Sequence, residues 1–127
     1  MKKYLLLFFL LINNTGFAEY TWKKIAYSID GNVTYVDDRT IKVVGEMRYY
    51  LMLTDYAKPT SFGHLSSKNY MQVNCANYNI KLLKNFYYDE PMANGEPSEI
   101  NSTESEWVTF LPGSLGEKIV KYVCDIK

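Results

Sequence analysis

The 127-residue sequence contains few of the residues and none of the motifs that common catalytic and metal sites use. It has one histidine, His64, and two cysteines. No HExxH, CxxC, P-loop or dinucleotide-binding pattern occurs, and no serine lies in a GxSxG context. A histidine that activates a nucleophile also needs an orienting acid, which no pattern around His64 supplies. We therefore expect a binding protein rather than an enzyme, with no cofactor or metal, and we expect His64 in a solvated loop.

The sequence also lacks an excess of charge of either sign. Lysine and arginine together number 14, and so do aspartate and glutamate. A nucleic-acid-binding surface needs a basic footprint, which this balance excludes. Six acidic residues gather between Asp89 and Glu106, but they lack the Asp/Asn spacing and fixed glycine of a calcium loop.

No apolar run is long enough to span a membrane. The longest, Leu5–Ile12, is shorter than the ~20 helical residues that a bilayer core of about 30 Å requires. It follows Lys2 and Lys3 and precedes the small residue Ala18, which is the layout of a secretory signal peptide. We predict a cleaved signal peptide at residues 1–18 and a single mature domain at residues 19–127.

The predicted mature chain is exported without a lipid anchor, because no cysteine follows the apolar run. We expect it in the periplasm, at the cell surface or outside the cell. Loss of Lys2 and Lys3 leaves 12 basic and 14 acidic residues, a net charge near −2. The two cysteines of an exported chain should pair in an oxidising compartment, and two buried free thiols are the alternative. A Cys75–Cys124 bond would close a loop of about 50 residues, for which chain entropy gives roughly 4 kcal/mol.

Most of the mature sequence alternates between apolar and polar residues, which is typical of β-strands. The segment Tyr78–Asp89 also fits a helical stripe, but its short length and aromatic end favour a strand. Glu90–Glu106 is expected to form a long acidic loop with at most one edge strand. The other predicted strands are Thr21–Ile29 and Val33–Asp37 around the hairpin signal DGN, Ile41–Gly45 as a short strand or extended link, Glu46–Tyr56, and Lys68–Ala76.

One helix is predicted near the end of the chain. Ser114 is placed to cap it, and Glu117 three residues later completes a capping-box pattern. Apolar residues then recur at helical spacing, at Leu115, Ile119, Tyr122 and Val123. The sequence therefore predicts an α+β fold in which an antiparallel β-sheet of about five to six strands packs against one C-terminal α-helix, with one disulfide.

Alternation also divides the strand residues between two faces of the sheet. We assign Leu51, Leu53, Met71, Val73 and Ile119 to the side that packs against the helix. The opposite side is then the candidate protein-binding face, because aromatic residues and arginine are enriched at protein interfaces. Ordinary strand surface is the alternative interpretation. The residues expected on this face are Arg48, Tyr50, Tyr70, Lys81, Lys84 and Tyr87.

Several segments, in their order and spacing, resemble the bacterial surface-adhesin protein E-like family. They run from Trp22 to Ile41 and continue with YLMLTDYAKP (Tyr50–Pro59), SSKNYMQVNC (Ser66–Cys75), FYYDEPMANGE (Phe86–Glu96) and WVTFLPGSLGEKIVKYVC (Trp107–Cys124). The resemblance implies an antiparallel sheet on a C-terminal helix, secured by a disulfide. It also implies an exported bacterial protein that binds host extracellular proteins, such as matrix or serum proteins, through its sheet face or loops. A second copy of the chain is another candidate partner, and a periplasmic accessory or structural protein is the alternative function.

Overall fold

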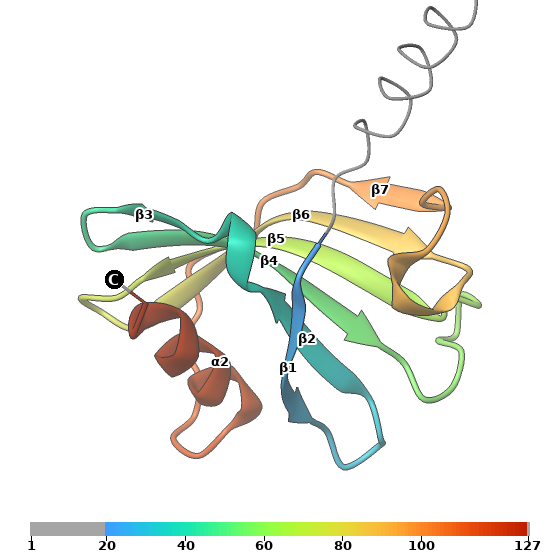
Figure 1. Ribbon diagram of the computed structural model, residues 1–127, viewed down its shortest axis with the longest axis horizontal. Coiled ribbons are helices and arrows are strands. Elements are labelled where there is room, and N and C mark those ends of the chain that lie inside the picture. The colour runs from blue at the N-terminus through green and yellow to red at the C-terminus, as the bar shows by residue number, and fades with distance from the viewer. Residues whose placement is uncertain (1–19, 127) are drawn as a thin grey trace, which may run out of the picture.

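The computed structural model describes residues 20–126, so the predicted signal peptide at residues 1–18 lies outside the described residues. One antiparallel sheet contains all seven strands of the described residues, in the order β1-β2-β4-β5-β6-β7, with β3 also paired to β4 (Figure 1). The elements are β1 (Trp22–Tyr27), β2 (Val33–Asp37), the 3₁₀-helix η1 (Asp38–Thr40), β3 (Lys42–Val44), β4 (Met47–Asp55), β5 (Ser66–Asn74), β6 (Asn79–Tyr88), the 3₁₀-helix η2 (Pro91–Ala93), β7 (Glu99–Asn101) and α2 (Leu115–Cys124).

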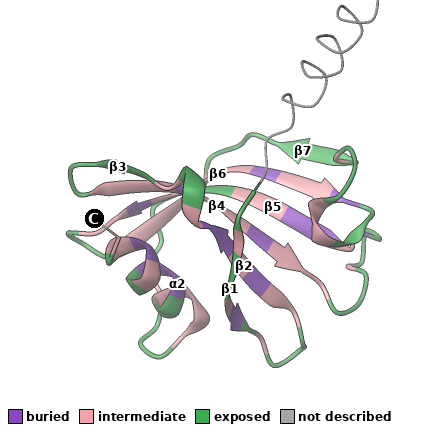
Figure 2. Ribbon diagram, viewed as in Figure 1, coloured by how far each residue is buried: buried purple, intermediate pink, exposed green. Residues whose placement is uncertain are grey.

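The predicted fold class is confirmed, and the number of strands is slightly higher than expected. The two shortest strands, β3 and β7, have three residues each, and all six of these residues are exposed (Figure 2). Such short exposed edge strands bury no face, so they leave a weak alternating pattern in the sequence. The ambiguous segment before the acidic loop is the strand β6, as predicted.

The long strand β4 is the centre of the sheet. It pairs with β5 along its whole length, while β2 and β3 share its other edge. The connection between β2 and β3 is held by Asp37, which is fully buried. Its carboxylate accepts hydrogen bonds from the backbone N–H groups of Thr21 and Arg39 at 3.0 and 3.2 Å, and from the Thr40 hydroxyl at 2.9 Å.

The core lies between the sheet and α2, which covers one side of it (Figure 1). Burial of the apolar side chains of this core stabilises the domain. The helix begins at the predicted cap, with the Ser114 side chain accepting a hydrogen bond from the Glu117 N–H at 3.3 Å. The return half of the capping box is not formed, because the Ser114 N–H donates to the Leu111 carbonyl at 3.1 Å. The Glu117 carboxylate contacts the Lys121 ammonium at 3.2 Å. The buried core residues are Val36, Tyr50, Met71, Val73, Ile119, Val120 and Val123.

The predicted disulfide is confirmed. Cys75 and Cys124, separated by 49 residues, are bonded, and both are partly buried against the core. Cys75 follows the last residue of β5, and Cys124 is the last residue of α2. The bond therefore ties the end of the helix to the end of β5, a central strand of the sheet.

The predicted faces of β5 are correct, whereas those of β4 are wrong. Directly paired residues of antiparallel strands point to the same side of a sheet. Tyr50 pairs with the buried core residue Met71, and Leu51 pairs with Tyr70, which points away from the helix. Tyr50 is therefore on the helix side and Leu51 and Leu53 are on the other. The alternation is strong on both faces of β4, so it could not decide which face the helix covers.

Candidate functional site

The side of the sheet away from α2 presents a continuous set of aromatic and lysine side chains, which we call the outer sheet face. The strand register places them together, because Tyr49 pairs with Gln72, Gln72 with Lys81, and Tyr70 with Lys84. The single α-helix of the described residues lies on the opposite side (Figure 1). The outer sheet face consists of Tyr49, Lys68, Tyr70, Gln72, Lys81, Lys84, Phe86 and Trp107.

The centre of the outer sheet face is a pair of tyrosines. The rings of Tyr49 and Tyr70 stack with their centroids 6.3 Å apart. The Gln72 amide donates a hydrogen bond to the Tyr49 hydroxyl at 3.1 Å, which fixes the position of that ring. Tyr70 remains 37 % exposed. The pair is therefore an ordered aromatic surface that is open to a partner.

Two lysines flank this pair, and each lies over an aromatic ring. The Lys84 ammonium is 5.2 Å from the centroid of the Phe86 ring, and the Lys81 ammonium is 5.2 Å from the centroid of the Trp107 ring. Lys81 also forms an ion pair with Glu104 at 3.6 Å. Cation–π contacts of this kind order long lysine side chains at a surface. The outer sheet face therefore combines apolar rings with ordered positive charge.

Lys68 belongs to the same face but is already engaged within the protein. Its ammonium lies 5.0, 5.1 and 5.8 Å from the ring centroids of Tyr20, Phe86 and Tyr88 and donates to the Tyr20 hydroxyl at 3.3 Å. Burial alone would lower the pKa of Lys68, but its interactions with Tyr88 and Tyr20 outweigh burial and raise that pKa. This aromatic cage attaches the start of the described chain, where Tyr20 stacks on Trp22, to the sheet.

Three of the six residues predicted for the binding face lie together on the outer sheet face: Tyr70, Lys81 and Lys84. Two others do not, because the two faces of β4 are reversed relative to the prediction. Tyr50 is only 1 % exposed, within the core. Arg48 pairs with buried Val73 on the helix side, and its guanidinium donates to the backbone carbonyls of Gly45 and Met47 at 2.9 and 3.2 Å.

The sixth predicted residue, Tyr87, lies away from the outer sheet face and stacks on His64 with the centroids 5.0 Å apart. Burial, with smaller contributions from Tyr56 and Glu99, raises the pKa of Tyr87. The aromatic members that the sequence prediction missed are Tyr49, Phe86 and Trp107. Tyr49 could have been found only with the correct orientation of β4.

His64 is buried, which corrects the expectation of a solvated loop residue. Its two ring nitrogens lie 3.5 Å from the Asp89 carboxylate and 3.3 Å from that of Glu99. Both acids come from the acidic part of the chain that follows β6, and they fold back over the histidine. This cluster joins three segments that are distant in sequence, which is why the sequence pattern around His64 did not predict it.

No group of three or more histidine, cysteine, aspartate or glutamate side chains within the described residues, 20–126, is placed to hold a metal ion. No helix in the same range has the length and apolar character needed to cross a membrane.

Comparisons with known proteins give a consistent family and fold. The sequence profile described as Surface-adhesin protein E matches residues 22–125. A solved structure of Haemophilus influenzae protein E aligns with a TM-score of 0.65 at 16 % identity, over 86 % of this chain and 87 % of that chain. Crystal form II of the same protein gives a TM-score of 0.62 at 16 % identity, over 86 % of this chain and 91 % of that chain. At such identities the structural likeness shows the fold alone. A search of curated proteins found no match.

Proposed function

This chain belongs to the surface-adhesin protein E family and is an adhesin-like surface protein, and from this premise we propose that its outer sheet face binds host extracellular proteins. The partner class is a matrix or serum protein with an apolar patch bordered by carboxylates. Apolar side chains would pack on the tyrosine pair, and carboxylates would meet Lys81 and Lys84.

The observation that carries this proposal is the ordered set of aromatic and lysine residues on the side of the sheet that α2 does not cover, centred on Tyr49 and Tyr70. Isolated exposed aromatic residues are normal, whereas a contiguous group is typical of an interaction surface. Aromatic residues also contribute most of the binding energy at many protein interfaces. The tyrosine pair is held in place before binding, so little side-chain entropy is lost when a partner docks.

Export and a non-enzymatic role are parts of the same proposal. The sequence pattern of residues 1–18 supports export, and the Cys75–Cys124 bond supports an oxidising compartment such as the periplasm or the cell exterior. Membership of an adhesin family favours a binding protein over an enzyme. We further propose that the mature protein reaches the cell surface without a lipid attached to its N-terminus.

The proposal is tested with purified residues 19–127 and a panel of immobilised matrix and serum proteins, with binding followed by biolayer interferometry. We expect at least one partner to bind. The double variant Tyr70→Ser/Lys84→Glu should bind that partner about tenfold more weakly or worse, because it removes an aromatic contact and reverses a charge. Absence of binding to every protein of the panel by the folded parent protein would contradict the proposal.

The matched control is Phe62→Ser, which removes an aromatic residue from the loop between β4 and β5. Phe62 is 82 % exposed and lies outside the outer sheet face. This variant should bind like the parent. If Phe62→Ser abolishes binding while the double variant retains it, the loop rather than the sheet face is the interface. If the double variant instead converts a parent dimer into monomers in sedimentation velocity, the partner of this face is a second copy of the chain.

A further inference from the structure

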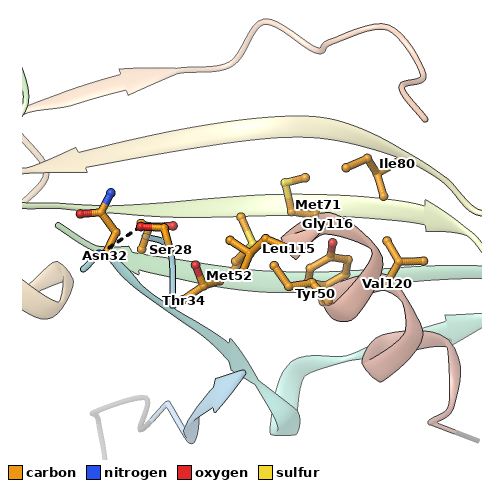
Figure 3. A pocket seen from close by; sticks show the side chains of 12 residues that line it. Ser28, Asn32, Thr34, Tyr50, Met52, Met71, Ile80, Leu115, Gly116 and Val120 are labelled. Atoms are coloured by element: carbon orange, nitrogen blue, oxygen red, sulfur yellow. Dashed lines mark hydrogen bonds between the residues drawn. The ribbon is translucent and has the colours of Figure 1, made fainter. Parts of the chain in front are cut away.

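A cavity of about 270 Å³ lies between α2 and the sheet, on the side opposite the outer sheet face (Figure 3). Its sheet wall includes Met52, Met71 and Ile80, and its helix wall includes Leu115 and Ile119. All twelve residues that line it are uncharged. An occupant that carried a charge would lose its hydration and find no opposite charge in these walls. The lining therefore selects an uncharged molecule.

The Tyr50 hydroxyl lies at the wall of the cavity. Tyr50 is only 1 % exposed, and its hydroxyl forms no hydrogen bond with the other residues drawn in Figure 3. The hydroxyl points past the ring toward the space beside Met71 and Gly116 (Figure 3). Burial raises the pKa of Tyr50 far above the usual tyrosine range, so the hydroxyl stays protonated and can donate. A protonated hydroxyl that faces the cavity is free to donate a hydrogen bond to an oxygen of an occupant.

The other end of the cavity is polar. It is formed by the β1–β2 hairpin, the start of β2 and the end of β4. The residues there are Ser28, Asn32, Thr34 and Thr54. The Ser28 hydroxyl accepts a hydrogen bond from the Asn32 N–H at 3.2 Å (Figure 3). The cavity thus has apolar walls, one hydroxyl donor from Tyr50 and a polar end. This is the usual composition of a small-molecule site.

The volume limits the size of the occupant. It lies between the ~150 Å³ of an apolar cavity that holds benzene and the roughly 300–1,000 Å³ of pockets for drug-sized ligands. A molecule of about ten non-hydrogen atoms therefore matches it. We propose that this cavity binds a small uncharged organic molecule, with an apolar ring or branched chain, whose oxygen accepts a hydrogen bond from the Tyr50 hydroxyl. This site is separate from the proposed protein-binding face, and neither proposal depends on the other.

A matched pair of probes tests the proposal: acetophenone, which has a carbonyl oxygen, and α-methylstyrene, which has the same shape with a CH₂ group in place of that oxygen. Each is titrated into ¹⁵N-labelled residues 19–127 and into the Tyr50→Phe variant, and amide chemical shifts are recorded. Acetophenone should bind saturably and shift amides of the lining residues. Loss of the hydroxyl should weaken acetophenone binding about three- to tenfold, the usual range for one hydrogen bond. α-Methylstyrene should bind the parent and the variant equally.

Three results would overturn the inference. In the first, the parent shows no saturable shift at the lining residues with either probe. In the second, Tyr50→Phe binds acetophenone as tightly as the parent does. In the third, the shifts fall on the outer sheet face instead of on β4 and α2. The mapping on the parent needs no variant, so the proposal can be refuted even if Tyr50→Phe were to fold poorly.

Discussion

Tyr50 and Tyr70 show how one residue type takes opposite roles on neighbouring strands. Tyr50 contributes to the core under α2 and is 1 % exposed, whereas Tyr70 is 37 % exposed on the outer sheet face. A tyrosine ring can be buried or can cover a surface, because it has an apolar body and one polar end. The residue type alone therefore did not reveal the role, and the register of the strand decided it.

This difference predicts unequal effects of the same substitution. Tyr50→Ser should lower the free energy of unfolding by about 3–5 kcal/mol, because it leaves a large cavity in the core. Tyr70→Ser should lower it by less than about 1 kcal/mol, because the residue lies at the surface. Urea unfolding followed by circular dichroism measures both. Equal losses, or a greater loss for Tyr70→Ser, would show that the faces are assigned the wrong way round.

Tyr122 on α2 is coupled to Asp38, because its hydroxyl donates a hydrogen bond to the Asp38 carboxylate. Burial, followed by the hydrogen bond and the charge of Asp38, raises the pKa of Tyr122 from 10.0 to about 12. Between pH 10 and about 12 the unfolded chain loses the Tyr122 proton, whereas the folded chain keeps it. The resulting stabilisation is complete below pH 10 and is lost as the pH rises toward 12.

We therefore expect the free energy of unfolding to fall more between pH 8 and 11 in the parent than in Tyr122→Phe. At pH 8 the variant should be less stable by about 1 kcal/mol, from the lost hydrogen bond to a partly exposed carboxylate. Urea unfolding at the two pH values provides the comparison. The same pH-dependent loss in both proteins would mean that Tyr122 titrates alike in the folded and unfolded states.

At the scale of elements, local patterns predicted the individual strands and the helix well. Alternation identified β4 and β5, the short length and aromatic end of its segment favoured β6, and Ser114 and the apolar stripe identified α2 within a residue or two. These features depend on residues close together in sequence. The orientation of β4, the Lys68 cage and the burial of His64 depend on contacts between distant segments. Tyr20 lies 48 residues from Lys68, and Glu99 lies 35 from His64, so no local pattern indicates either contact.

The start of α2 gives an element-scale prediction. Ser114→Ala should destabilise the protein by about 1 kcal/mol, because the N–H of Glu117 loses its acceptor. Glu117→Gln should have a smaller effect, within about 0.5 kcal/mol, since its carboxylate contributes an i,i+4 pair with Lys121, whose side chain is largely exposed. Thermal unfolding followed by circular dichroism compares the loss of stability in the two variants. A larger loss for Glu117→Gln would show that the charge of Glu117 stabilises the helix start more than the Ser114 cap does.

At the scale of the whole molecule, the disulfide connects the two layers. It fixes the C-terminal end of α2 to the end of β5, while the opposite end of the helix forms part of the wall of the proposed small-molecule site. The sheet thus separates two surfaces. The cavity lies on the helix side, and the proposed protein-binding face lies on the other.

Replacing both cysteines by serine should lower the free energy of unfolding by about 4 kcal/mol, as chain entropy predicts for a loop of this length. A domain of this size has a total stability of about 5–15 kcal/mol, so the variant should be marginally stable. Denaturant unfolding measures this loss in the free energy of unfolding. The parent is unfolded with and without reductant, and the double variant is unfolded under the same conditions. A loss below about 1 kcal/mol would mean that packing alone secures α2.

The central claim is that this protein recognises its partner through the outer sheet face, and lysine acetylation footprinting tests it most directly. The protein is acetylated alone and in complex with the panel protein that it binds most tightly, and the modification of each lysine is measured by mass spectrometry. Lys81 and Lys84 should be protected in the complex, whereas Lys118 and Lys121 on α2 should react as they do in the free protein. Protection of Lys118 and Lys121 with unchanged reactivity at Lys81 and Lys84 would contradict the account.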